Sequence, residues 1–291
     1  MSTLIDLGDG RSERSETTPL VSGRSTGRRW RSRLGVVAPP AAVALVFVAI
    51  WYFASYVALD KQRRFLLPPP HEVFKTGVFE SPTRSEILTA LWSTSKVAAL
   101  GLLLATLLGM ALAIAMHQAR WIERSFYPWA VVLQTVPILA IVPVIGFWWG
   151  FDFRSRIVVC VMIGIFPIIT NTLFGLKSVP RDQRDLFRLH DAGRITRLVK
   201  LDLPGARPAV FTGLRISAGL SVIGAIVADF FFRQGEPGIG RLIDTYRAKL
   251  ASEALFASIG YSCLLGVIAF WLVGMAAHRS IGQWHDSGVP E

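Results

Sequence analysis

The sequence predicts an all-α membrane protein with six transmembrane helices and a long cytoplasmic loop between helices four and five. Of its 291 residues, 52% are hydrophobic and 18% are charged, whereas soluble domains have roughly 45–50% apolar and about 25% charged residues. Six long stretches are almost free of charged side chains, and many basic residues lie beside them. This composition excludes a disordered, a fibrous and an ordinary cytosolic protein.

Each predicted span follows from its length and its lack of charge. A hydrocarbon core about 30 Å thick needs about 20 helical residues. Five stretches without Asp, Glu, Lys or Arg reach that length, namely Leu34–Leu59, Val97–Ala119, Ser125–Phe151, Ile157–Leu176 and Ala254–His278. A sixth stretch, Pro208–Phe232, carries Arg215 and Asp229 near its ends. The first stretch starts too late and is too long for a cleavable signal peptide.

The spans divide the chain into three parts. Residues 1–33 are rich in Ser, Thr, Gly and Arg, and we expect them to form a disordered basic cytoplasmic tail. Residues 34–278 form the predicted transmembrane domain, which includes the long loop at 177–207. Residues 279–291 form a predicted cytoplasmic C-terminal tail.

The distribution of Lys and Arg predicts the orientation. With both termini in the cytoplasm, the cytoplasmic segments contain 18 Lys and Arg and the external loops contain 11. Basic residues are enriched on the cytoplasmic side of membrane proteins. The net charge of +11 therefore indicates lipid headgroups as the partner of the basic residues, and no nucleic acid.

The loop at 177–207 begins with a predicted short amphipathic helix. Pro180 followed by Asp182 suits a helix start, and Leu186 and Leu189 then recur at helical spacing. The dipeptide Ala192-Gly193 predicts a break after this helix.

A second short helix is predicted beyond the break. It would place Ile195, Leu198 and Val199 on one face and would end at Pro204. Two such helices form a knob with an apolar face and many arginines. This pattern favours contact with either a membrane surface or a groove in another protein.

The loop resembles the coupling loop of ABC-importer permeases, the inner-membrane components of binding-protein-dependent transport systems. Their signature is Glu-Ala-Ala, three residues, Gly, nine residues, Ile, any residue, Leu-Pro. Aligning its end with Leu203-Pro204 places Leu201 at the Ile position, Asp191 at the Gly position and Asp185-Leu186-Phe187 at Glu-Ala-Ala. Only Leu-Pro is identical, and a shift of the glycine to Gly193 stays open.

Other segments are similar to the branch of this family that imports nitrate, sulfonates, taurine and pyrimidine precursors. The similarity covers roughly residues 35–285 in the family's order and spacing. It is carried by Phe65–Val73, Gln134–Pro143, Phe166–Leu176, Gly213–Gly219 and Gly238–Ile243.

The resemblance implies an ABC importer type I permease-like fold that works as a dimer, a homodimer being favoured over a heterodimer. Each coupling loop would dock on a cytoplasmic ABC ATPase, and an extracytoplasmic solute-binding protein would deliver a small solute at the bacterial cell membrane. The chain has no G-x-x-x-x-G-K-[ST] phosphate loop, so ATP would bind to the partner. We expect no cofactor and no enzymatic activity. A stand-alone secondary carrier or channel is the alternative function.

By residue-wise comparison, the ATPase would contact the segment from Asp185 to Pro204. Apolar anchors and flanking charges are expected at Asp185, Leu186, Phe187, Arg188, Leu189, Asp191, Gly193, Arg194, Ile195, Leu198, Leu201, Leu203 and Pro204.

The translocation path is predicted from polar groups and prolines at membrane depth, where an unsatisfied polar group is costly. The candidates are Gln134, Pro137, Asn171, Thr172, Arg215, Ser217, Ser221 and Asp229. Hydrogen bonding between helices is the alternative role for these polar side chains. We expect Arg215 to reach the cytoplasmic interface and Asp229 to face the external mouth.

A metal site is not predicted, because the five histidines show no ligand spacing such as H-x-x-x-H. The solute stays open among nitrate, a sulfonate, taurine and a pyrimidine or flavin precursor.

Overall fold

The computed structural model of the chain describes residues 27–281, with side chains described from residue 38 to residue 280. Within these residues the structure consists of helices and connecting loops, without a β-strand. The chain divides into two compact units at residues 50 and 51. The outer parts of both predicted tails, residues 1–26 and 282–291, lie outside the described residues.

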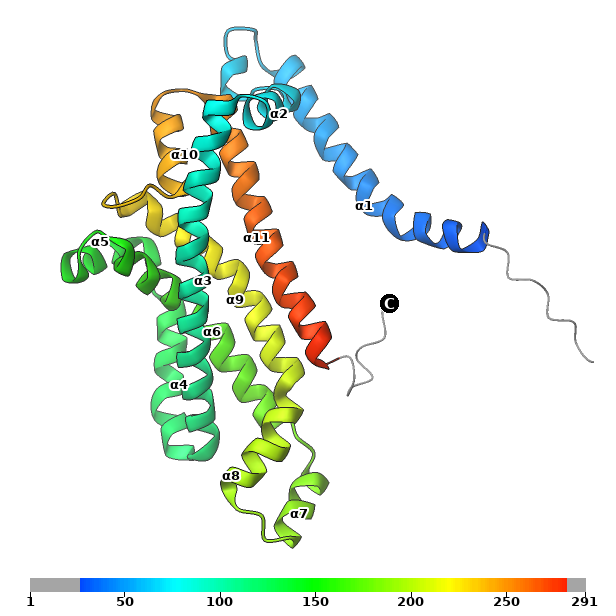
Figure 1. Cartoon of the computed structure of the whole chain (residues 1–291), viewed down its shortest axis with the longest axis vertical. Helices are drawn as coiled ribbons and strands as arrows, with labels where there is room; N and C mark the ends of the chain where they lie inside the picture. Colours follow the sequence, from blue (N-terminus) through cyan, green and yellow to red (C-terminus); the bar gives the residue numbers. More distant parts are fainter. Residues whose placement is uncertain (1–26, 282–291) are drawn as a thin grey trace, which may run out of the picture. The chain divides into compact units, whose positions relative to one another are not determined.

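The helices follow one another along the chain as shown in Figure 1. Their bounds are α1 (Gly27–Phe53), η1 (Ala54–Ala58), η2 (Arg64–Leu66), α2 (Pro70–Val78), α3 (Ser81–Gln118), α4 (Arg120–Thr135), α5 (Ile138–Trp149), α6 (Phe153–Lys177), α7 (Arg181–Leu189), α8 (Arg194–Arg197), η3 (Leu198–Asp202), α9 (Leu203–Phe231), α10 (Ile239–Ala248) and α11 (Ser252–Ile281).

The first predicted span is a helix. The apolar stretch Ala38–Ala58 runs through α1 and the π-helical turn η1, and it is long and apolar enough to cross a membrane. Large side chains such as Leu45 and Phe47 are each 69% exposed. An apolar helix with exposed side chains is suited to a lipid environment. Because α1 begins at Gly27, the last seven residues of the predicted tail at 1–33 belong to this helix.

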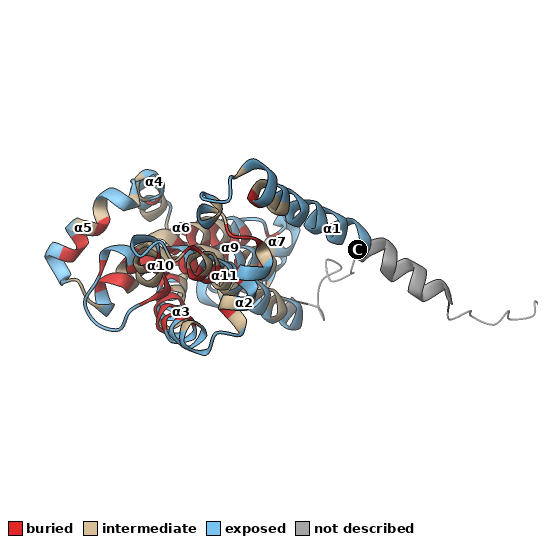
Figure 2. Ribbon diagram, turned by 90° about the horizontal axis from the view of Figure 1, so that it is seen from above, coloured by how far each residue is buried: buried red, intermediate tan, exposed pale blue. Residues whose placement is uncertain are grey.

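The buried core of the second unit lies where α3, α6 and α9 pack together, as the burial colours of Figure 2 show. Small residues permit these close contacts, as is common between membrane helices. An added Cβ at Gly213 on α9 would lie 2.7 Å from the carbonyl oxygen of Pro167 on α6. An added Cβ at Gly101 on α3 would collide with the Cβ of Cys160 on α6. The three helices therefore form one tightly packed unit.

Five helices are long and apolar enough to cross a membrane, and a bent pair brings the number to as many as six in the described residues. Helix α3 starts at Ser81, 16 residues before the predicted span at Val97. Only the part of α3 without charged side chains suits the hydrocarbon core of a membrane. The helix itself begins earlier, with a first part that carries Arg84, Glu86 and Lys96.

The predicted span Ser125–Phe151 is divided into two helices. The structure has α4 and α5, which meet at an angle of 104° around Val136 and Pro137. Pro137 has no backbone N–H, and its ring disfavours the helical conformation of the preceding residue. Val136 accordingly has an extended backbone with ψ 126°. This bend separates the two halves of the predicted span.

The predicted helix end at Pro204 is wrong. The chain is helical from Arg194 through Phe231, so α8, η3 and α9 follow one another without a break. Pro204 lies in the first turn of α9, directly after the π-helical turn Leu198–Asp202. In this wider turn the N–H of Leu203 donates to the carbonyl oxygen of Leu198. The altered hydrogen-bond register accommodates a proline that lacks a donor.

We predict that Gly101→Ala destabilises the protein by about 1–3 kcal/mol, because α3 and α6 would have to move apart to admit a methyl group. The melting temperature in detergent should fall. Gly266→Ala is the matched control, since an added Cβ there has nothing within 4 Å. Equal melting temperatures of the two variants would contradict the close approach of α3 and α6.

Candidate functional site

The segment between α6 and α9 projects from one end of the second unit, with α7 and α8 at its tip (Figure 1). Helix α7 begins directly after Pro180 and carries Asp182 in its first turn. It ends at Leu189, and α8 starts at Arg194 after a short turn. The predicted first helix and the predicted break are therefore confirmed.

Asp191 is the residue that reverses the chain within this turn. Its φ angle is 47°, in the left-handed region, whereas Gly193 has a φ angle of −60°. Left-handed backbone favours Gly and, after it, Asn or Asp. Asp191, which the resemblance aligns with the Gly position of the coupling-loop signature, therefore has a backbone conformation that favours glycine, whereas Gly193 does not.

Four large apolar side chains of this segment are exposed. The exposed fractions are 54% for Leu186, 82% for Leu189, 78% for Ile195 and 55% for Val199. We call these four residues the docking face. An exposed cluster of large apolar side chains at a surface commonly marks an interaction site. Val199 was absent from the predicted contacts, although it lies in the predicted second helix.

The other predicted contact residues differ in accessibility. Leu198 and Leu203 pack against the core cluster formed by Leu176, Ala206 and Val210. Their side chains therefore help to hold the segment, and Leu198 offers less surface to a partner than predicted. Phe187, Leu201 and Pro204 are half-buried, whereas Asp185, Arg188, Asp191, Gly193 and Arg194 are exposed.

The same segment contains a buried carboxylate. Asp202 is completely buried, and its carboxylate lies near Nε2 of His117, Nε of Arg184 and Nε of Arg197. Sequence analysis missed this cluster. Asp202 is the single acidic residue between Asp191 and Asp229. That isolation among basic residues is the signal that could have identified it.

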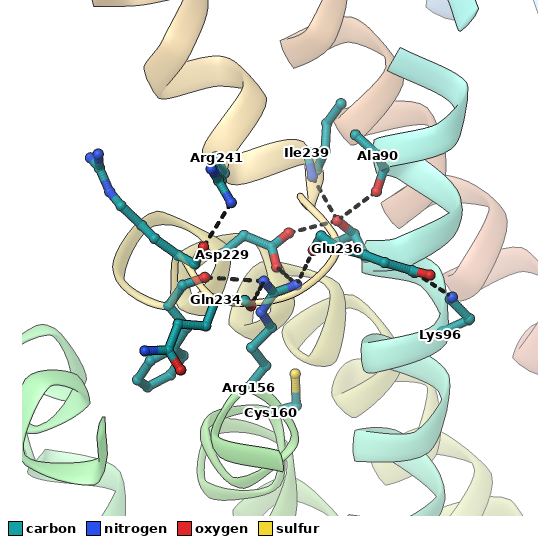
Figure 3. Close-up of polar contacts among 12 residues, drawn as sticks. Ala90, Lys96, Arg156, Cys160, Asp229, Gln234, Glu236, Ile239 and Arg241 are labelled. Carbon is teal, nitrogen blue, oxygen red and sulfur yellow. Dashed lines mark hydrogen bonds and ion pairs between the residues drawn. The ribbon is translucent and has the colours of Figure 1, made fainter. Parts of the chain in front are cut away.

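A second buried charge cluster lies toward the opposite end, where α3, α6 and α9 meet the loop before α10 (Figure 3). Asp229 is completely buried, with Nη1 of Arg156 3.3 Å from its Oδ1. Oγ1 of Thr94 donates to Oδ2 of Asp229 at 2.6 Å, and the N–H of Ile239 donates to the same Thr94 oxygen at 2.8 Å. The predicted exposure of Asp229 at an external mouth is therefore wrong in this chain, because its carboxylate is enclosed by these groups.

Arg156 fixes the loop after α9 through backbone carbonyls. Its guanidinium donates to the carbonyl oxygens of Phe232, Gln234 and Glu236 at 3.0–3.1 Å. Lys96 also pairs with Glu236 at 2.7 Å, and this hydrogen bond lowers the pKa of the Glu236 carboxyl. The cluster therefore ties the loop to α3 and α6.

The remaining path candidates fall into two groups. Thr172, Ser217 and Ser221 are completely buried within the chain, and Ser217 donates to the carbonyl oxygen of Gly164 at 2.6 Å. This contact joins α9 to α6, so Ser217 has the alternative role of hydrogen bonding between helices. The second group is more accessible, with Gln134, Pro137 and Arg215 exposed and Asn171 half-buried.

Arg215 lies on α9 with its guanidinium carbon 4.3 Å from the centre of the Phe270 ring on α11. Its Nε would be 3.2 Å from an added Cβ at Gly274. The arginine thus stacks on α11 while remaining exposed in the single chain. Such a cation–π contact stabilises an arginine side chain.

Comparison with known proteins identifies the family. Residues 105–283 match the binding-protein-dependent transport system inner membrane component. The chain belongs to this family. It is therefore the permease component of an ABC importer and a multi-pass membrane protein, as its apolar helices require. Transport permeases of this kind are not normally enzymes.

Several relatives are similar over most of the chain. The formylaminopyrimidine transport permease protein ThiX of Halalkalibacterium halodurans is 31% identical over 231 residues, which cover 79% of this chain and 90% of that protein. The putative aliphatic sulfonates transport permease protein SsuC of Escherichia coli is 28% identical over 83% of this chain and 89% of its own length. The nitrate import permease protein NrtB of Leptolyngbya laminosa is 34% identical over 63% of this chain and 65% of its own length. The branch predicted from the sequence is thus confirmed.

We predict that Arg156→Leu destabilises the protein by about 3–5 kcal/mol, since it leaves the Asp229 carboxylate buried without its cation. Thermal unfolding in detergent measures this loss. Arg154→Leu is the control, because Arg154 lies two residues before Arg156 on α6 and its side chain is exposed. The double change Arg156→Leu and Asp229→Leu should recover part of the lost stability. A double variant no more stable than Arg156→Leu would contradict the pairing.

We predict that Asp191→Gly is tolerated, whereas Asp191→Val destabilises the turn by about 1–2 kcal/mol, the cost of left-handed backbone for such a residue. Limited proteolysis between α7 and α8 measures the effect, and the valine variant should be cut faster. Gly193→Val is the control position, because φ at residue 193 suits any residue. Faster cleavage of the Gly193 variant alone would refute the assignment of Asp191 to the turn.

Proposed function

We propose that this permease receives its ATPase on the docking face, works as a homodimer and has both termini in the cytoplasm. The observation that supports the proposal best is the exposure of Leu186, Leu189, Ile195 and Val199. A partner groove that buries such side chains removes their apolar surface from water, which favours binding. Importers of this family use a separate ATPase, and this chain has no phosphate-binding loop.

Charge on the segment favours a protein partner over a lipid surface. Besides its arginines, α7 carries the exposed acidic residues Asp182 and Asp185, and Asp191 follows in the turn. Carboxylates are repelled by the anionic headgroups of a cytoplasmic leaflet. A protein groove can instead pair with both signs of charge.

The opposite end of the second unit would then face outward, toward the binding protein. Between α2, α3, α10 and α11 this end has a cavity of about 520 Å³, lined by Glu72, Lys75, Glu80, Tyr246 and Glu253 among others. Cavities with mixed charge suit polar contacts with a second protein. We propose this face as the docking surface of the extracytoplasmic solute-binding protein.

For the solute path we propose the exposed candidates Gln134, Pro137 and Arg215 and the half-buried Asn171. An arginine at membrane depth is too costly to face lipid without water or a partner. In a homodimer Arg215 would therefore lie against the water-filled path or the second subunit. The relatives are named for formylaminopyrimidine, nitrate and aliphatic sulfonates, and we propose that the solute of this chain is a small polar molecule of that range.

The test of ATPase docking is copurification with mass spectrometry. We predict that the double variant Leu189→Asp and Ile195→Asp copurifies with at least about tenfold less ATPase than the wild type. A tenfold loss of affinity corresponds to about 1.4 kcal/mol, and buried apolar anchors commonly contribute more than that to binding. The carboxylates would have to be buried without partners.

Phe79→Asp is the matched control for this experiment. Phe79 is 70% exposed and directly follows α2, near the opposite end, so its variant should retain the ATPase. Equal recovery of ATPase with the double variant and the control would overturn the assignment of the docking face. Binding of the docking face to anionic lipid vesicles, with no ATPase recovered from the wild type, would favour the lipid-surface interpretation.

A further inference from the structure

The buried carboxylate of Asp202 holds together parts of the chain that are far apart in sequence. Nε2 of His117 lies 3.2 Å from its Oδ2, Nε of Arg184 lies 3.5 Å from Oδ1, and Nε of Arg197 lies 3.6 Å from Oδ2. His117 is in the last turn of α3, Arg184 is in α7 and Arg197 is in α8. One carboxylate therefore connects both short helices of the segment to a membrane-spanning helix.

Arg184 extends this connection to α6. Its Nη2 donates to the carbonyl oxygen of Leu176 at 2.6 Å. Leu176 lies in the last turn of α6, where backbone carbonyls have no partner within the helix. The Asp202 cluster thus joins the cytoplasmic ends of α3 and α6 to α7 and α8.

The balance of charge makes the cluster resist separation. Among the described residues, Arg184 and Arg197 each have one acidic side chain within ion-pair distance, and for both it is Asp202. Moving the segment away from α3 would break the hydrogen bond between Asp202 and His117 at a buried site, where such a bond is stronger than in water. Removing the carboxylate would leave two permanent positive charges facing each other. Either change would loosen the segment from α3.

The π-helical turn sets the direction of Asp202. Asp202 is the last residue of η3, while Val199 and Lys200 of the same turn are exposed. Within this one turn, the side chain of Val199 therefore faces the surface and the carboxylate of Asp202 faces the interior. Single π-helical turns are frequent at functional sites, and here the turn lies between the docking face and the span α9.

We propose that Asp202 is a positioning residue for energy coupling, which makes the docking face and the cytoplasmic end of α3 move as one body. This proposal rests on the proposed docking of the ATPase. Displacement of α7 and α8 by the ATPase would reach α3 through the contacts of Asp202 with Arg184, Arg197 and His117 rather than being absorbed by a flexible loop. Asp202 acts through its cationic partners and needs no contact with ATP or with solute.

The first measurement is the distance between spin labels on the two connected parts. Labels at Gln183→Cys on α7 and Arg120→Cys beside the end of α3 are both at exposed positions. The exposed Cys263 is replaced by Ser, whereas the buried Cys160 is retained. In nanodiscs without ATPase, we expect Asp202→Asn to broaden the distance distribution at least about twofold and Asp202→Glu to restore most of the narrow distribution.

Asp182→Asn is the matched control, because it removes the charge of an exposed aspartate from α7, the helix that carries one of the spin labels. Its distance distribution should equal that of the wild type. A narrow distribution in Asp202→Asn would overturn the positioning role. This arm does not depend on an ATPase, so it separates failure of this proposal from failure of the proposed docking.

The second measurement is transport per ATP hydrolysed, in proteoliposomes with the copurified ATPase and the solute-binding protein. Nitrate, an alkanesulfonate and formylaminopyrimidine serve as test solutes. We expect Asp202→Asn to retain the ATPase and its hydrolysis but to import at least about fivefold less solute per ATP, with Asp202→Glu restoring the ratio. A ratio equal to that of the wild type would overturn the coupling role even if the distance distribution broadens.

Discussion

The structure depends on the close approach of α3, α6 and α9. Between membrane helices there is little hydrophobic driving force, so packing and hydrogen bonding must hold them together. Gly101 and Gly213 allow backbones to approach, and Ser217 on α9 donates to the carbonyl oxygen of Gly164 on α6. Helices α2, α4, α5, α10 and α11 of the second unit each pack against at least one of these three helices.

Buried charges secure both ends of this core. Toward one end Arg156 and Asp229 hold the loop before α10, and toward the other Asp202 holds α7 and α8. Burying a single charge is very costly, so each carboxylate is enclosed by cations and hydrogen-bond donors. These clusters tie the loop before α10 and the segment with α7 and α8 to the bundle. In the proposed coupling, such ties would let a motion at one end be passed to the helices of the bundle.

In the proposed docking of the ATPase, support of the segment by the core would serve function. Leu189 and Ile195 are exposed at the tip, whereas Leu198 and Leu203 of the same segment pack inward. An interaction surface is more effective when its side chains are presented by a supported element, since less conformational entropy is lost on binding. The inward residues and Asp202 provide that support.

The sequence by itself determined the fold class, the family, five of the apolar spans, the start of α7 and the break before α8. These features depend on local composition, proline and glycine signals, and motif spacing, which need no knowledge of distant contacts. Pro137 and Pro204 are visible in the sequence, but only the structure showed that the first bends the chain and the second does not end a helix. The burial of Asp202 and Asp229 was decided by tertiary packing alone. Their partners Arg184, His117, Arg156 and Thr94 come from other helices. Because a buried pair forms only when separate helices pack, spacing along the chain could not reveal it.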